Sequence, residues 1–242
     1  MTYSIVACCP RTGQYGVAVA TYSPMVGSAV PLVVGGRAAV AYQVVASPIH
    51  RALAGQLLSA GASAEGALAE LATKDPYWQS RQVTLVDMFG RVAGFTGANA
   101  PAHCGHRLGE GFAVAGNVLT ETCLDDTWKE FSATQGGELS LAERLVRALE
   151  AGARSNGQPE GLTSAALLVH GPEPVPLVDL RVDVHDAPVK ELRRIWEFVS
   201  PLQGFYLQRK TNPAGLPRWW QRRMEVVPGW KPNHLVKVVP QQ

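Results

Sequence analysis

The sequence of 242 residues lacks any apolar run long enough to cross a membrane. A membrane-spanning helix needs roughly 18 or more consecutive apolar residues. The N-terminus also lacks the basic stretch and apolar run of a secretory signal peptide. The sequence therefore predicts neither membrane insertion nor export, and we expect a cytoplasmic protein. With 46% hydrophobic and 17% charged residues, the chain can build a substantial folded core.

Cysteine is scarce, and its four occurrences do not form a metal-binding pattern. Cys8 and Cys9 are adjacent, whereas Cys104 and Cys123 stand alone. Zinc sites use closely spaced pairs such as CxxC, which this sequence does not contain. We expect four reduced, mostly buried thiols, no metal and no cofactor.

The net charge of +2 excludes a strongly basic protein, but the charge is unevenly distributed. Residues 203–242 carry seven Lys or Arg and one acid, so the rest of the chain has a net charge of −4. Three tryptophans and five prolines in this stretch disfavour a regular helix and favour an extended arm. We predict one domain over 1–200 and a Pro/Trp-rich basic arm over 201–242.

The arm has two interpretations. Its tryptophans are expected to anchor a packed seam against the body or another subunit, which favours a homodimer or larger assembly. A basic, aromatic segment can also bind nucleic acid or an anionic surface, and we regard that interpretation as the less favoured one.

Apolar periodicity predicts helices in pairs between runs of strands. The predicted strands are residues 3–8, 15–21, 37–43, 81–87, 91–96, 112–114, 163–170 and 176–184, and the predicted helices are 49–60, 63–73, 121–135, 140–151 and 187–199. Ser63 and Ser140 are predicted helix N-caps, and Gly61 and Gly152 are predicted stops. Since paired helices do not build an alternating parallel sheet, we predict an α+β protein with helix layers over largely antiparallel sheets.

The second residue offers a nucleophile. A small residue after Met1 permits removal of the initiator methionine, and Thr2 would then carry both a hydroxyl and a free α-amine. The ordinary pKa of an α-amine is about 8, close enough to neutrality to accept the hydroxyl proton. Met-Thr starts are common, so this pattern indicates an N-terminal nucleophile only together with its context.

That context comes from motifs spread along most of the chain. They are residues 2–7, 16–21, 26–31, Gln43, 57–61, 63–68, 81–83, 96–97, 105–106, 111–117, 164–169 and 179–185. In this order, the motifs resemble the DUF1028 family, a group of uncharacterised proteins similar to the Ntn hydrolases. The resemblance covers about residues 2–196.

The resemblance implies a four-layer αββα sandwich with Thr2 at the mouth of its sheets. An Asn side chain or backbone N–H groups beside glycine can stabilise an oxyanion, which makes Gly116-Asn117 the candidate for that role. Gly-Asn is also ordinary turn chemistry. Four further hydroxyl and amide side chains are expected to line the pocket or to position the amine: Thr21, Gln43, Thr96 and Ser164. The alternative is that they satisfy nearby backbone groups.

We predict mainly structural roles for the charged side chains and histidines in these motifs. Asp183 and Arg181 would share one strand face, so an ion pair is expected and a substrate contact is the second interpretation. His106 and His185 are favoured as structural histidines over metal ligands or proton-transfer groups.

We therefore predict an amidohydrolase that cleaves a small amide or ureido-type C–N bond. The chain departs from the family pattern at three positions, where Ala115, His103 and Val184 replace Gln, Trp and a second acid. The alternative is a non-catalytic protein of the same fold that uses its pocket and Trp-rich arm for binding or assembly.

Overall fold

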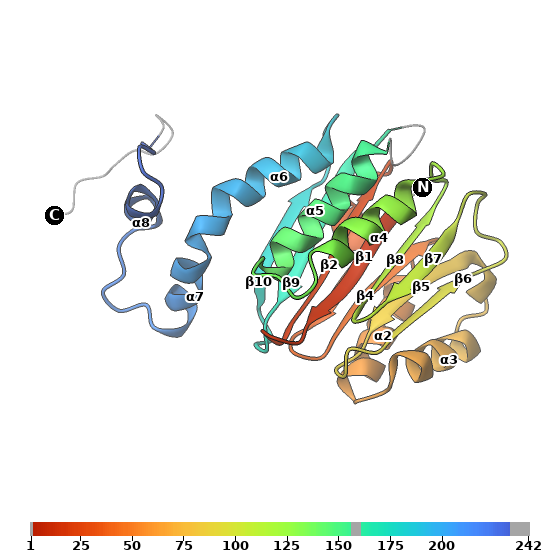
Figure 1. Cartoon of the computed structure of the whole chain (residues 1–242). Helices are drawn as coiled ribbons and strands as arrows, with labels where there is room; N and C mark the ends of the chain where they lie inside the picture. The colour runs from red at the N-terminus through yellow and green to blue at the C-terminus, as the bar shows by residue number, and fades with distance from the viewer. Residues whose placement is uncertain (1, 156–160, 233–242) are drawn as a thin grey trace. The chain divides into compact units, whose positions relative to one another are not determined.

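The computed structural model describes residues 2–155 and 161–232. The chain divides into two compact units, residues 1–193 and 194–242. Two antiparallel sheets form the centre of the first unit (Figure 1). In the described part of the chain, no helix combines the length and the apolarity needed to cross a bilayer.

Sheet A has the strand order β10-β9-β2-β1-β8-β7, and sheet B has the order β3-β4-β5-β6. The strands of sheet A are β1 (Thr2–Cys9), β2 (Gln14–Thr21), β7 (Gly105–Gly109), β8 (Phe112–Asn117), β9 (Ser164–His170) and β10 (Pro176–Val182). Those of sheet B are β3 (Pro31–Val34), β4 (Ala38–Val44), β5 (Arg81–Val86) and β6 (Val92–Thr96). Neighbouring strands pair antiparallel, as predicted.

Helices cover the outer faces of both sheets (Figure 1). Helices α4 (Cys123–Ala133) and α5 (Leu141–Arg154) pack on sheet A, and α2 (Pro48–Ser59) and α3 (Ala64–Lys74) pack on sheet B. The short elements are α1 (Val26–Ala29) and η1 (Trp78–Ser80), and α6 (Pro188–Val199) follows sheet A. The layers run α, β, β, α, which confirms the predicted sandwich.

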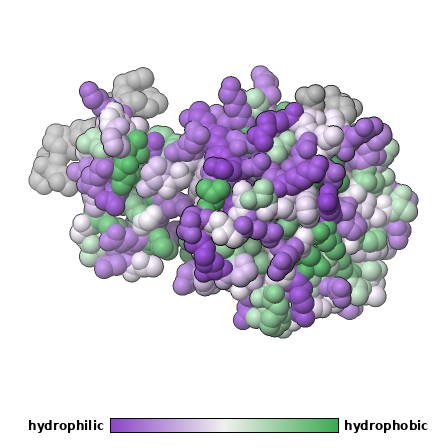
Figure 2. Space-filling view, in the orientation of Figure 1, coloured by the Kyte–Doolittle hydropathy of each residue, from purple (hydrophilic) through white to green (hydrophobic). Residues whose placement is uncertain are grey.

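The core between the sheets consists of small and β-branched side chains. Val6, Val17 and Val19 of sheet A meet Ala39 and Ala41 of sheet B, and all five are buried. Because both faces of the central strands are covered, these strands are almost continuously apolar rather than alternating. The outward face of α4 and α5 is largely hydrophilic, as an outer layer should be (Figure 2).

The predicted N-caps are confirmed, but one predicted stop is wrong. Ser63 and Ser140 accept hydrogen bonds from backbone N–H groups three residues on, and α2 ends just before Gly61. Helix α5, however, continues past Gly152 to Arg154. A Cβ at Gly152 would lie 2.6 Å from the Tyr3 ring, so this glycine permits close packing of α5 on β1 instead of ending the helix.

The second unit corrects the prediction of an extended arm. It contains η2 (Ser200–Leu202), α7 (Gln203–Thr211) and α8 (Trp219–Val226). Pro213 and Pro217 lie between the helices, so the prolines punctuate this segment without preventing helix formation. Trp219 and Trp230 pack against Phe198 of the same unit. Residues 233–242 of the predicted arm lie outside the described residues.

A hydroxyl and amide site at the Thr2 end of the sheets

The N-terminal end of β1 carries a row of polar residues across four strands of sheet A. Thr2 is the direct partner of Thr21 on β2 and of Asn117 on β8. Thr21 is in turn the partner of Ser164 on β9. Cross-strand partners share one face of a sheet. Register therefore brings together four residues that are distant in the sequence.

The threonine hydroxyls at this row are in direct contact. Thr2 Oγ1 lies 3.1 Å from Thr21 Oγ1, and the backbone N–H of Ser23 points to Thr21 Oγ1 at 3.4 Å. Thr2 is 7% exposed, so its hydroxyl lies at the edge of the protein interior. The predicted convergence of Thr21 on Thr2 is present in the structure.

Asn117, which is fully buried, has one satisfied and one unsatisfied polar atom. Its Nδ2 donates to Gln82 Oε1 at 3.1 Å. Its Oδ1 has no hydrogen-bond partner among the described residues. A buried acceptor without a donor is uncommon and costly, so it marks a place where a further donor would be stabilised.

An amide network connects this row to sheet B. Ser4 Oγ donates to Gln43 Oε1 at 2.8 Å, and Gln43 Nε2 donates to Gln82 Oε1 at 2.7 Å. Ser4, Gln43 and Gln82 are at most 1% exposed. The network is neutral, so it crosses the inter-sheet core without burying a charge.

Gln82 is the centre of the network, and sequence reasoning did not assign it a role. Its Nε2 points to Thr96 Oγ1 at 3.0 Å and to the backbone oxygens of Gly105 and Gly116 at 3.0 and 2.9 Å. Gln82 is the direct cross-strand partner of both Gln43 on β4 and Thr96 on β6. The available signal was a glutamine, a residue that is not enriched in strands, at the second position of the predicted strand 81–87.

The outer end of the network is His106. Thr96 Oγ1 lies 2.9 Å from His106 Nδ1. Although His106 as a residue is exposed, its ring packs over Gly94, and this desolvation lowers the pKa of the imidazole. Ala115 lies between Ser4 and His106 in register, so this departure from the family pattern falls inside the site.

Two predicted site residues have other partners. Ser164 Oγ donates to the Ser23 carbonyl at 2.6 Å and accepts the Val26 N–H at 3.1 Å, so it ties the chain after β2 to sheet A. The expected pair of Arg181 with Asp183 is wrong, because Arg181 binds Asp179 at 3.2 Å. Strand β10 ends at Val182, so alternation no longer places Asp183 beside Arg181.

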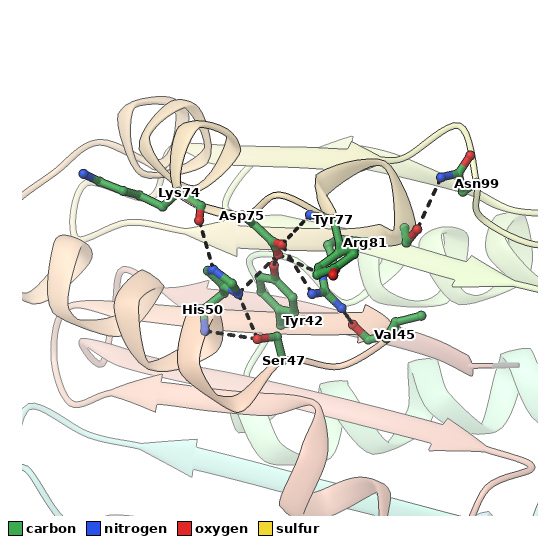
Figure 3. Close-up of polar contacts among 10 residues, drawn as sticks. Tyr42, Val45, Ser47, His50, Lys74, Asp75, Tyr77, Arg81 and Asn99 are labelled. Atoms are coloured by element: carbon green, nitrogen blue, oxygen red, sulfur yellow. Dashed lines mark hydrogen bonds and ion pairs between the residues drawn. The ribbon is translucent and has the colours of Figure 1, made fainter.

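Behind the network, on the helix-covered face of sheet B, lies an ionic clamp formed by Asp75, Tyr42 and Arg81 (Figure 3). Asp75 Oδ2 accepts the Tyr42 hydroxyl at 2.6 Å and Arg81 Nε at 2.8 Å. Tyr42 and Arg81 directly precede Gln43 and Gln82 in their strands. Since side chains alternate along a strand, the clamp and the network occupy opposite faces of the same strand ends.

The clamp is electrostatically satisfied. Burial by itself would raise the pKa of Asp75, but hydrogen bonds from Arg81 and Tyr42 outweigh it and lower that pKa to about 2. Burial and the hydrogen bond to Asp75 together raise the pKa of the Tyr42 hydroxyl. His50 Nδ1 also lies 3.3 Å from Asp75 Oδ2. The carboxylate therefore fixes β4, β5 and the start of α2 together.

Backbone strain gathers around the same strand ends. Four non-glycine residues with positive φ are found among the described residues: Met25, Val44, His103 and Val118. Val44 (φ 74°) follows Gln43, and Val118 (φ 52°) follows Asn117. Positive φ in a β-branched residue is unfavourable and persists only when the surrounding structure imposes it. Two of the three network amides, Gln43 and Asn117, are therefore followed by strained residues.

The described residues contain no cluster of three His, Cys, Asp or Glu side chains suited to a metal ion. Three of the cysteines are buried and Cys104 is exposed, and all four are free, which agrees with the predicted thiols. The fold and site define a four-layer αββα protein with a neutral hydroxyl and amide site where its two sheets meet. No curated protein matches the chain.

The chain belongs to the DUF1028 family, described as a family of unknown function, whose sequence profile matches residues 2–192. The crystal structure of protein SPO2555 from Silicibacter pomeroyi, a DUF1028 protein, is similar at 30% identity and a TM-score of 0.74. That match covers 82% of this chain and 86% of the other. Anbu (ancestral beta-subunit) from Yersinia bercovieri matches at 11% identity and a TM-score of 0.42, covering 89% and 98% of the two chains.

Proposed function

We propose that the protein is an amidohydrolase that uses Thr2, freed by removal of Met1, to cleave a small amide or ureido-type C–N bond. Thr2 Oγ1 attacks the carbonyl carbon, and its proton passes to the α-amine of the same residue. The C–N bond breaks as the amine returns the proton to the leaving nitrogen. Water then hydrolyses the acyl-threonine ester.

The observation that carries the proposal is the convergence of three side chains from three strands at the end of β1. The Thr2 hydroxyl contacts the Thr21 hydroxyl at 3.1 Å, and Asn117 stands directly opposite Thr2 with a buried oxygen that has no partner in the described part of the chain. In this assignment Thr21 orients the nucleophile. Holding a reacting group in one geometry is a large part of catalysis.

Asn117 has two roles in the proposal. Its Nδ2 uses one hydrogen on Gln82 and retains a second, which is available to the oxyanion. Its Oδ1, which has no donor among residues 2–155 and 161–232, would accept a hydrogen bond from the α-amine of Thr2. An α-amine held by Asn117 Oδ1 is oriented toward the hydroxyl of the same threonine.

The test is the intact mass of the purified protein before and after treatment with a small acylating electrophile. We expect loss of Met1 and a single adduct that persists in Thr2→Ser and disappears in Thr2→Ala. Thr12→Ala, a change in the exposed turn after β1, is the matched control and should keep the adduct. If Met1 is retained and no specific adduct forms, Thr2 is not the nucleophile.

A second candidate is a non-catalytic binding or assembly protein of the same fold. It is favoured by Ala115, which replaces the glutamine of the family pattern between Ser4 and His106. If that replacement removed activity, Ala115→Gln should create hydrolysis of amides where the natural chain shows none. Under the amidohydrolase proposal, the natural chain is already active.

A further inference from the structure

A pocket lies at the opposite end of β1 from Thr2. Its volume is about 460 Å³, and its walls include Cys8, Cys9, Arg11, Leu139 and Arg144. Thr2 and Cys9 are the two ends of an eight-residue strand, which separates them by roughly 23 Å at 3.3 Å per residue. The pocket is therefore distinct from the hydroxyl and amide site, and its size suits a small molecule.

Arg144 is a buried cation in the wall of this pocket. The residue is 6% exposed, its Nε donates to Thr134 Oγ1 at 3.1 Å, and its guanidinium carbon lies 4.1 Å from the centre of the Phe131 ring. Its Nη2 has no hydrogen-bond partner, and no carboxylate among the described residues forms an ion pair with it. A buried charge without a counter-ion is costly, so an anion placed there would be strongly favoured.

The other groups around the pocket do not supply that anion. Burial raises the pKa of Cys8 to about 11, so its thiol is neutral at pH 7. Arg11 adds a second cation, whose side chain is half-exposed and lies 3.8 Å from the exposed Glu138. Glu110 is the acid in the wall, but among the described residues its carboxylate forms no ion pair with Arg144.

We propose that this pocket binds a small organic carboxylate, whose charge pairs with Arg144 and whose apolar body lies against Leu139 and Phe89. A planar guanidinium matches a carboxylate by two parallel hydrogen bonds. Leu139 and the exposed Phe89 supply apolar surface in the same wall. Arg11 is a second cation in the wall of the pocket.

The experiment is calorimetric titration of the full-length protein with benzoate and with benzyl alcohol, a probe of similar size that has neither a charge nor an amide bond. We expect saturable binding of benzoate and no measurable binding of benzyl alcohol. Arg144→Met should weaken benzoate binding at least tenfold. Arg147→Met, a change of an exposed arginine on the same helix that pairs with Glu143, should leave binding unchanged.

Equal binding of the two probes, no binding of benzoate, or unchanged affinity in Arg144→Met would each overturn the proposal. If Arg144→Met does not fold, Leu139→Trp is the second variant. The larger side chain fills the pocket and leaves the cation in place, so it should also weaken benzoate binding. Thr2→Ala should bind benzoate normally, so failure of this proposal and failure of the amidohydrolase proposal can be distinguished.

Discussion

Two groups of buried polar side chains lie on opposite faces of the neighbouring ends of β4 and β5. They compensate the cost of burying polar atoms in different ways. On the face toward sheet A, Gln43 and Gln82 form a neutral network that ends at Asn117, whose Oδ1 has no partner among the residues that the structure describes. On the face toward the helices, Tyr42 and Arg81 surround Asp75.

The difference separates a structural group from a candidate functional one. The clamp uses full charges, and its buried carboxylate has a partner at each oxygen. The network avoids charge and, within the described chain, leaves the Asn117 Oδ1 acceptor without a donor opposite Thr2, where β1 begins. A fully satisfied group fixes geometry, whereas an incompletely satisfied one can accept a further group. We infer that the clamp positions the network from behind.

Removing the carboxylate of the clamp should have the largest effect on stability. Asp75→Ala leaves Arg81 buried without its counter-ion, and we expect a loss of about 3–5 kcal/mol in the free energy of unfolding. Urea denaturation measures this. Asp179→Ala, which removes the exposed partner of Arg181, should change stability by less than about 1 kcal/mol. Similar losses in both variants would contradict the distinction between the clamp and surface ion pairs.

Removing the centre of the network should have a smaller but still large effect. Gln82→Leu leaves the amides of Gln43 and Asn117 without their shared acceptor, and we expect a loss of about 3 kcal/mol. Gln56→Leu, on the exposed face of α2, should stay within about 0.5 kcal/mol of the natural protein. A tolerated Gln82→Leu would show that the network does not hold the two sheets together.

Acid should weaken the clamp and spare the network. The pKa of Asp75 is about 2 in the folded protein and 3.8 ordinarily, so its contribution is complete above the ordinary value and is lost as the pH falls toward 2. Between pH 5 and pH 2 we expect the natural protein to lose roughly 2 kcal/mol more stability than Asp75→Asn. Denaturation curves at several pH values test this, and parallel curves for the two proteins would refute it.

Relieving backbone strain between the two groups should have the smallest effect. Val44→Gly removes an unfavourable positive φ, so we expect its stability to remain within about 1 kcal/mol of the natural protein. Val92→Gly, at a half-buried strand position that lacks a positive φ, should be clearly destabilising. Thermal denaturation compares the two variants. An equal loss in both would mean that φ at Val44 imposes no strain.

Parts of the site could be predicted from the sequence because their signals are local. The position of Thr2, the Gly-Asn at the end of β8 and the capping serines of α3 and α5 all follow from neighbouring residues. Family resemblance supplied the layer order. The polar partners in sheet B were not accessible in this way, since Gln82 and Asp75 acquire their roles from strands and helices distant in the chain.

The sequence by itself determined the antiparallel sheets, the paired helices and the residues at the end of β1, because periodicity and capping act over a few residues. Tertiary structure decided which hydroxyls and amides meet, which carboxylate Arg181 binds, and why α5 continues through Gly152. It also left Arg144 without a carboxylate partner in the described residues. These outcomes depend on register and packing between distant segments, which a local pattern does not encode.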